Sequence, residues 1–234
     1  MKIVIAHLYY DLLNLYGESG NVKALKKYLE NQGIEVVLEN KSVNEKFEFG
    51  KYDFIYIGSG TENNLSIALE DLKRYRKEIK EYIKNNKFFL STGSSIEIFG
   101  KSISFNDKVS DGLNIFPYTI KRENKRYVCE SVLNYKKYDL EVIGFQNRCG
   151  FMYQNDKAIF EVIKGNGMNL ESKEEGLAYN NFIGTYTVGP ILARNPELLS
   201  IIANDLILSI DKDYKIKEIY RYSRLQFNLY SGTL

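Results

Sequence analysis

Few side chains in this sequence have the chemistry of a nucleophile or a base. The chain contains one histidine, His7, and two cysteines, Cys129 and Cys149. A single histidine leaves little scope for a His-based metal site or for a triad in which histidine relays a proton. Two cysteines do not make a disulfide framework and are typical of a protein in a reducing compartment. The sequence therefore predicts no metal site, no cofactor and a cytoplasmic location.

One stretch has the pattern of an active-site scaffold without the reacting atom. Residues 87–90 read as a buried strand, Gly93 as a sharp turn and Ser94 as the start of a helix. In α/β enzymes such a strand, turn and helix present a nucleophile at the carboxyl edge of a sheet. Here the turn residue is glycine, which has no side chain. The elements around the turn decide how it is to be interpreted.

The first half of the chain predicts a doubly wound α/β fold. Continuous apolar runs are typical of parallel strands that are buried on both faces, and they occur at residues 3–6, 34–38, 52–57 and 87–90. Helices are expected over residues 22–32 and 66–85. Ligands of such folds bind outside the carboxyl ends of the strands. There the small residues Gly58, Ser59 and Gly60 would let backbone N–H groups approach a ligand, although they also fit a tight turn.

The second half predicts antiparallel strands followed by helices. Alternating residues at 118–121 and 126–133 predict a hairpin that turns around residues 123–125. Further strands are expected at 140–145, 158–163 and 182–188, a helix over 196–209 and an outer helix over 211–222. No linker rich in Pro, Gly or Ser interrupts the chain. We therefore expect a single domain over residues 1–234, with about 211–234 as a C-terminal extension.

The charge balance excludes some classes of partner. The net charge is +2, from 32 basic and 30 acidic residues, so bulk electrostatic binding to nucleic acid is not expected. No apolar run approaches the roughly 18 residues of a membrane span.

Several stretches resemble one family, the class I glutamine amidotransferases of the CobB/CobQ type. Within it they are most similar to the GatD subunits that pair with a Mur-ligase-like MurT subunit. The matching segments are residues 7–21, HLYYDLLNLYGESGN; 56–62, YIGSGTE, similar to a GGGQ turn; 144–148, GFQNR, similar to GFENH; and 184–190, GTYTVGP, with 194–196, similar to GTYLHGPLLPKNP. The resemblance implies a flavodoxin-like fold with a mostly parallel central sheet plus an antiparallel β section in the second half.

The turn at Gly93 matches the nucleophile elbow of this family, CGGYQLLG. Aligned on Gly100, Gly93 takes the place of the cysteine. Ser94 and Ser95 take the place of two glycines, and Glu97 takes that of the glutamine.

The resemblance implies a reaction whose key side chains are missing here. In the family a cysteine thiolate attacks the amide of glutamine, a histidine moves the proton, and ammonia passes to the synthetase partner. Val188 stands where the family has this histidine, and Arg148 replaces a second histidine. Backbone N–H groups would still form an oxyanion cradle for a small amide or carboxylate. The candidate oxyanion- and substrate-binding residues are Gly58, Ser59, Gly60, Ser94, Glu97 and Arg148.

Three residues are candidates to replace the catalytic cysteine and histidine of the family. Ser94 lies one position beyond the turn, so its side chain would point down the helix. Arg148 would lower the pKa of the neighbouring Cys149 thiol, but a half-buried structural cysteine is the commoner case. His7 ends the first strand at the carboxyl edge, where a structural or interface role is commoner than that of a relocated base.

Three hypotheses remain open. The chain is a non-catalytic subunit that binds a Mur-ligase-like protein, or a second copy of itself, in cell-wall precursor amidation. Alternatively it is an active glutaminase of altered mechanism that supplies ammonia to a peptidoglycan or cobyrinate-type carboxylate. A different ligand-binding or enzymatic role on the same scaffold is the third. The losses at Gly93 and Val188 favour the first, because removing either member of such a pair costs several orders of magnitude in rate.

Overall fold

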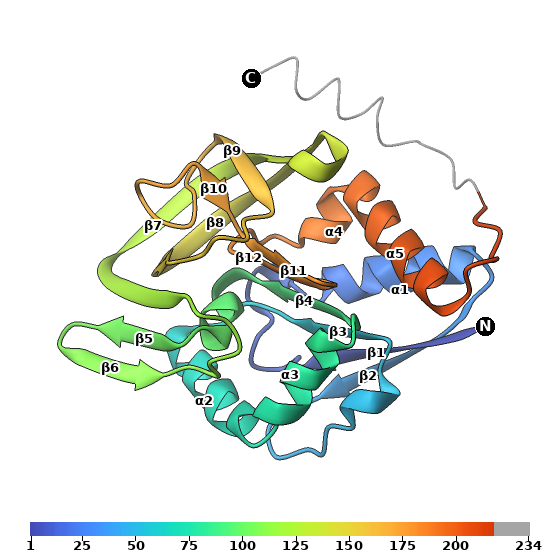
Figure 1. Ribbon diagram of the computed structural model, residues 1–234, viewed down its shortest axis with the longest axis horizontal. Helices are drawn as coiled ribbons and strands as arrows, with labels where there is room; N and C mark the ends of the chain where they lie inside the picture. Colours follow the sequence, from blue (N-terminus) through green and yellow to red (C-terminus); the bar gives the residue numbers. More distant parts are fainter. Residues whose placement is uncertain (218–234) are drawn as a thin grey trace.

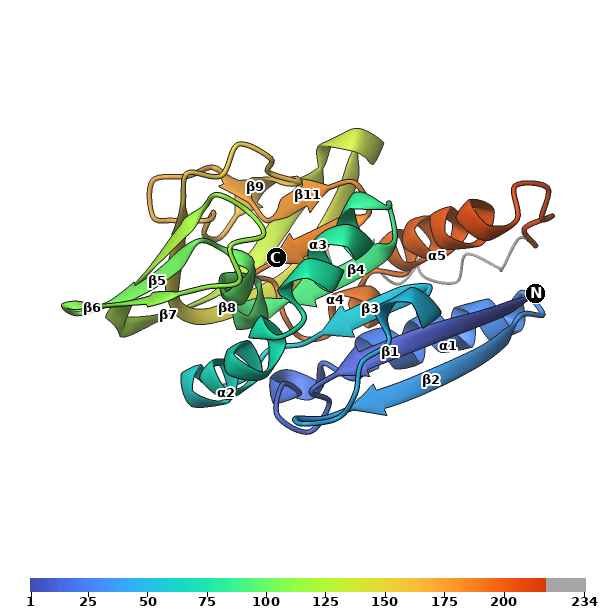
Figure 2. The ribbon, with the colours of Figure 1, turned by 60° about the horizontal axis from the view of Figure 1, so that its bottom comes forward.

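The computed structural model describes residues 1–217 and contains two six-stranded sheets (Figure 1). The first sheet has the order β11-β12-β4-β3-β1-β2. Its strands are β1 Lys2–Leu8, β2 Glu35–Lys41, β3 Phe54–Ile57, β4 Phe88–Thr92, β11 Leu177–Tyr179 and β12 Phe182–Thr185. All run parallel except β11, which is antiparallel to β12 at the edge. Figure 2 shows β1 and β2 side by side, leading away from the N-terminus.

Helices cover both faces of the first sheet. Alternate strand residues point to opposite faces; Ile3 and Ile5 pack with one set of helices, whereas Ala6 and Leu8 pack with the other. The first set is α1 Gly20–Asn31, α4 Ile191–Arg194 and α5 Pro196–Ile210; the second is α2 Glu62–Lys73 and α3 Arg76–Lys84. The predicted doubly wound arrangement is therefore confirmed.

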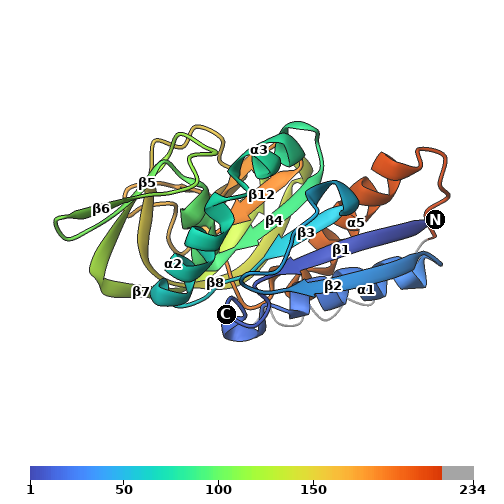
Figure 3. The ribbon, with the colours of Figure 1, turned by 90° about the horizontal axis from the view of Figure 1, so that it is seen from below.

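The second sheet is the antiparallel section expected from the second half of the chain. Its strands are β5 Ser102–Phe105, β6 Lys108–Asp111, β7 Thr119–Tyr135, β8 Leu140–Tyr153, β9 Phe160–Lys164 and β10 Glu174–Glu175. All neighbours pair antiparallel except β5 and β7. Figure 3 shows β5, β6 and β7 on the side of the molecule away from the N-terminus. Both hydrophobic cores contain side chains from both sheets.

The predicted hairpin around residues 123–125 is wrong. β7 continues through this segment, and only the pairing register with β8 shifts, between Arg122 and Tyr127. The reversal comes later, in a 3₁₀ turn Lys136–Tyr138 followed by Asp139 in the left-handed conformation, with φ +47°. The polar residues that suggested a turn therefore lie at a local irregularity of a long strand.

Two helix predictions also need correction. The single helix expected over residues 66–85 is two helices, because Tyr75 leaves the helical conformation, with φ −105° and ψ 12°. Its ring stacks on Phe47 at 5.0 Å between centroids, and its hydroxyl donates to the Glu45 carbonyl. The helix expected over 211–222 is absent from residues 211–217, and the rest of that range lies outside the described residues. Within the described chain, no helix is long and apolar enough to cross a membrane.

Candidate functional site

The elbow at Gly93 is present as a backbone conformation. β4 ends at Thr92, and Gly93 follows with φ +65°, opening a 3₁₀ helix, Gly93–Phe99. The sequence predicted the first turns of a helix there, and the structure forms them with the tighter winding. A positive φ strains any residue with a Cβ atom, but glycine adopts it without steric cost. The turn therefore has the geometry that elsewhere holds a nucleophile above a sheet.

The space in front of Gly93 is occupied by two other side chains. A Cβ atom built on Gly93 would lie 2.4 Å from Ser59 Oγ, 2.5 Å from Ser59 Cβ and 2.5 Å from Val188 Cγ1. Carbon atoms in contact are normally about 3.5–4.0 Å apart. Ser59 and Val188 are themselves buried. Position 93 therefore has no room even for a methyl group.

The backbone N–H that would serve an oxyanion is already bonded. Ser94 N–H donates to Ser59 Oγ at 3.2 Å, and the hydroxyls of these two serines lie 3.0 Å apart. Ser94 Oγ also donates to the Gly60 carbonyl at 3.0 Å. The Ser94 side chain thus turns towards the Gly-rich turn, contrary to the expectation that it points down the helix. Ser59, Gly60 and Ser94 form a closed hydrogen-bonded cluster in place of an open cradle.

The two glycines of the Gly-rich turn are explained by close packing. A Cβ on Gly58 would lie 2.3 Å from the Leu13 carbonyl oxygen, and one on Gly60 would lie 2.4 Å from Leu13 Cδ2. The Ser59 carbonyl between them accepts a hydrogen bond from Leu15 N–H at 2.9 Å. The turn is therefore covered by the loop that follows β1.

Glu97 lies buried in an ion pair. Its carboxylate accepts a hydrogen bond from Arg122 Nε at 2.7 Å, and both side chains are largely shielded from water. Burial raises the pKa of Glu97, and the nearby positive charge of Arg122 opposes that shift. Gly150 makes the room, because a Cβ there would lie 2.1 Å from Glu97 Oε1. The Glu97 carboxylate is therefore engaged by a partner inside the protein.

Arg148 acts as a buried clamp on the second sheet. It donates to Gln146 Oε1 and to the backbone carbonyls of residues 150, 167 and 168. Its guanidinium carbon lies 4.0 Å from the ring centroid of Tyr186 and 4.8 Å from that of Phe151. These contacts occupy the guanidinium with protein atoms, so Arg148 holds the loop before β10 to β8.

A buried glutamate that the sequence reasoning did not select joins the two halves of the site. Glu18 Oε1 accepts from Gly189 N–H at 2.8 Å, next to Val188. Its Oε2 accepts from Tyr56 Oη at 3.0 Å and closely from Thr92 Oγ1, next to Gly93. Burial raises the pKa of Glu18, while these hydrogen bonds favour its ionised form. The only signal was its place in the stretch 7–21, which resembles the subfamily so closely.

His7 is buried beside the ring of Tyr56, with 5.0 Å between centroids, and its Nε2 makes no hydrogen bond among the described residues. Burial lowers the pKa of His7 to about 4, so its ring is neutral at pH 7. The neighbouring side chains face other elements: Tyr9 Oη donates to Asp71 at 2.9 Å, and Asp11 accepts from Ser42 at 2.6 Å.

Cys149 is a buried thiol. Its Sγ lies 3.2 Å from Glu62 Oε1, and burial together with this carboxylate raises the pKa of the thiol to about 12. The expectation that Arg148 lowers this pKa is wrong, because the Arg148 guanidinium is turned to the carbonyls of residues 150, 167 and 168. A thiol of high pKa is a poor nucleophile at neutral pH.

Comparison with known proteins identifies the family to which the chain belongs. The model of the CobB/CobQ-like glutamine amidotransferase domain matches residues 4–196. The chain is 33% identical to the lipid II isoglutaminyl synthase (glutamine-hydrolyzing) subunit GatD of Streptococcus pneumoniae (strain ATCC BAA-255 / R6), over 84% of this chain and 77% of that protein. It is 27% identical to the subunit of the same name from Staphylococcus aureus (strain N315), over 96% and 93% of the two chains.

A solved structure supports the fold. A glutamine amidotransferase from Thermotoga maritima superposes with a TM-score of 0.51 at 10% identity, covering 90% of this chain and 86% of the other. The chain therefore belongs to the CobB/CobQ-like glutamine amidotransferase domain family and is similar to its GatD subunits.

Proposed function

We propose that this chain is a GatD-like subunit that does not hydrolyse glutamine and that acts in the cytoplasm as the binding or scaffold partner of a Mur-ligase-like protein. The observation that carries the proposal is the filled elbow. Gly93 offers no nucleophile, Val188 offers no base, and the Ser59 side chain lies within 2.5 Å of where a Cβ at position 93 would be.

Two different changes close the site. Loss of the thiol and imidazole removes the covalent step, which requires a nucleophile and a proton acceptor within hydrogen-bond reach. Occupation of the Ser94 N–H by Ser59 Oγ removes a donor that must point at the developing oxyanion. Removing one such donor costs about 10²–10³ in kcat in an acyl-transfer enzyme. An enzyme that had lost only its nucleophile by a single substitution would still have this N–H free to bind an oxyanion.

The available side chains do not supply a substitute. Ser94 Oγ is hydrogen-bonded to Ser59 and to the Gly60 carbonyl, and neither partner is a base. The raised pKa of Cys149 keeps its side chain a thiol at pH 7, and the lowered pKa of His7 makes its imidazole a weak base. These environments favour structural roles for all three residues.

The proposed partner follows from the names of the relatives. The streptococcal and staphylococcal proteins are subunits of a lipid II isoglutaminyl synthase, and the resemblance in residues 7–21 extends to subunits that pair with a Mur-ligase-like protein. The chain keeps the fold of its family although the space at Gly93 is filled. This is expected if the surface that binds the partner is retained. The substrate would then be a carboxylate of a cell-wall precursor, held by the partner.

The test distinguishes the release of ammonia from glutamine from the formation of a complex with the partner. The chain is co-purified with the Mur-ligase-like protein, and amidation of the precursor is measured with glutamine and, separately, with ammonium chloride as the nitrogen source. We expect a stable complex that amidates with ammonium and not with glutamine. Amidation that proceeds equally well with glutamine would contradict the loss of glutaminase activity, and failure to form a complex would contradict the scaffold role.

A further inference from the structure

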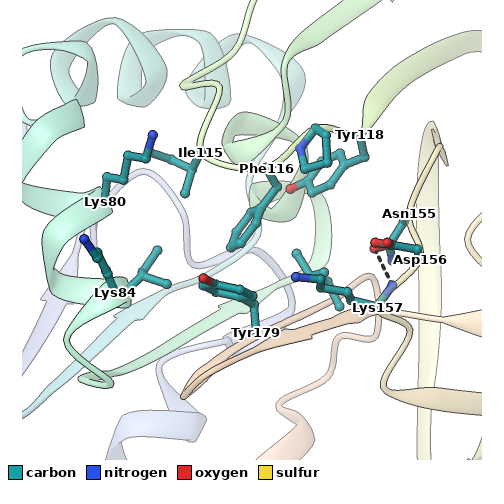
Figure 4. Close-up of a pocket in the computed structure, with 12 residues that line it drawn as sticks. Lys80, Lys84, Ile115, Phe116, Tyr118, Asn155, Asp156, Lys157 and Tyr179 are labelled. Atoms are coloured by element: carbon teal, nitrogen blue, oxygen red, sulfur yellow. Dashed lines mark hydrogen bonds between the residues drawn. The ribbon is translucent and has the colours of Figure 1, made fainter.

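A pocket away from the elbow is lined by three lysines (Figure 4). Its volume is about 340 Å³. Lys80 and Lys84 stand one turn apart on α3, and Lys157 lies across the pocket from them. Between them Figure 4 shows the rings of Phe116 and Tyr179. Four separate segments meet here, namely α3, residues 115–118, residues 155–157 and β11.

The floor of the pocket is apolar and fixed. Ile83, Phe116, Tyr118 and Leu177 line it and are all buried in the core. Phe116 packs edge-on against Tyr179, with 5.9 Å between ring centroids. Side chains held in this way do not need to rearrange when a ligand enters, which reduces the ordering cost of binding.

The positive charge at the rim is only partly balanced from within the protein. Lys80, Lys84 and Lys157 form no ion pair in the described part of the chain, and Asp156 is the one acidic residue among those that line the pocket. Lys157 Nζ instead lies over the ring of Tyr179, 4.2 Å from its centroid. The side chain of Asn155 is engaged by backbone and Met168. Like charges placed around one cavity repel each other and favour an anion between them.

From these features we propose that the pocket binds a small organic anion in which a phosphate or carboxylate group is attached to a compact apolar body. The anionic group lies among the three lysine ammonium groups, and the apolar body lies on the floor formed by Ile83 and Phe116. The pocket volume is at the lower end of the range of about 300–1,000 Å³ found for ligand sites, which favours a small molecule over a segment of a protein. The proposal is independent of the state of the elbow.

The proposal is tested by titrating the isotope-labelled full chain and following backbone amide signals by NMR. The probes are phenyl phosphate and benzoate, with benzyl alcohol as the neutral analogue and inorganic phosphate as the anion without an apolar body. We expect at least one of the first two to bind with a Kd of about 0.1–10 mM, at least tenfold more tightly than benzyl alcohol or inorganic phosphate. Whichever of the two binds more tightly identifies the anionic group.

Variants assign the binding to this pocket. Lys80→Gln, Lys84→Gln and Lys157→Gln should each weaken binding about two- to fivefold, and the triple variant on the order of tenfold or more. The matched control is Lys77→Gln, which removes the same charge from α3 at an exposed position that does not line the pocket. It should leave the Kd unchanged within about twofold.

Three results would overturn the proposal. Equal binding of benzyl alcohol and phenyl phosphate would show that the lysines do not select an anion. An equal effect of Lys77→Gln and Lys80→Gln would show only a general charge effect. An acidic peptide that binds more tightly than every small probe would assign the surface to a protein partner.

Discussion

Adding a single methyl group at Gly93 tests whether the elbow is filled. In Gly93→Ala the new Cβ meets Ser59 Oγ, Ser59 Cβ and Val188 Cγ1 at 2.4–2.5 Å. Rotation of the Ser59 hydroxyl cannot relieve the contact with Ser59 Cβ, so the surrounding backbone must move. Overpacking of this kind costs about 1–3 kcal/mol. The left-handed conformation adds about 1–2 kcal/mol for any residue with a Cβ. We expect a total loss of about 2–5 kcal/mol in the free energy of unfolding.

Gly17 provides the matched control. Its φ is +73°, close to that of Gly93, but a Cβ built there meets no heavy atom within 4 Å. Gly17→Ala should therefore show the conformational cost alone, about 1–2 kcal/mol. The difference between the two variants measures the steric overlap.

The assay is urea unfolding of the wild type and of the variants Gly93→Ala and Gly17→Ala. Gly93→Ala is also introduced into the double variant Ser59→Gly/Val188→Ala, and its cost there is measured relative to that double variant. Removing the two neighbours should reduce the cost of Gly93→Ala to that of Gly17→Ala. The filled elbow is refuted if Gly93→Ala costs no more than Gly17→Ala in the wild-type background, or if the background substitutions leave its cost unchanged.

Other groups give predictions that are checked by stability and by labelling. Because the pKa of His7 is lowered to about 4 in the folded protein, His7 takes up its proton at a higher pH in the unfolded chain than in the folded one. The free energy of unfolding should therefore fall by about 3 kcal/mol between pH 6.5 and 4. His7→Phe should remove that part of the pH dependence. Alkylation at mildly alkaline pH should modify Cys129 well before Cys149, whose pKa is raised to about 12, and mass spectrometry would contradict this if both reacted at the same rate. Glu97→Ala should cost about 3–5 kcal/mol because Arg122 is left buried without its partner, and adding Arg122→Met should recover a large part; a cost below about 1 kcal/mol would show that the ion pair is not a stabilising contact.

The arrangement of the first sheet could be predicted from the sequence because its signals are local. Apolar runs such as residues 3–6 and 87–90 are buried on both faces, so each reads as a parallel strand without knowledge of its neighbours. The turn at Gly93 was also visible, since a glycine between a buried strand and a helix is typical of a sharp turn. The antiparallel section follows from the alternating pattern of the second half together with the family resemblance.

The predictions that were wrong depend on contacts between distant residues. The break between α2 and α3 has no proline or glycine signal; it occurs where Tyr75 reaches Phe47. The continuous path of β7 through residues 123–125 is set by pairing with β8. A sequence carries no direct information on either contact.

At the elbow, too, the sequence indicates residue types but not the contacts between side chains. The motifs lead us to expect that Gly93 and Val188 stand where the family has its cysteine and histidine. The position of Ser59 could not be predicted, because the sequence does not show that its side chain lies against Gly93 and bonds the Ser94 N–H. Glu18 was likewise missed, although it ties the residue before Gly93 to the residue after Val188. The structure thus adds to the motifs which side chains lie against Gly93.

The measurement that tests this account most directly is ammonia release from glutamine by the full chain, alone and in complex with its Mur-ligase-like partner, with a glutamine amidotransferase that retains its cysteine as the positive control. We predict no release above the uncatalysed background in either form, and no change in Ser94→Ala, Cys149→Ala or His7→Phe. Sustained turnover on the order of 1 s⁻¹ or more, within the ordinary range of enzymes, would contradict the account, and its loss in one of these three variants would identify the residue that replaces the missing cysteine.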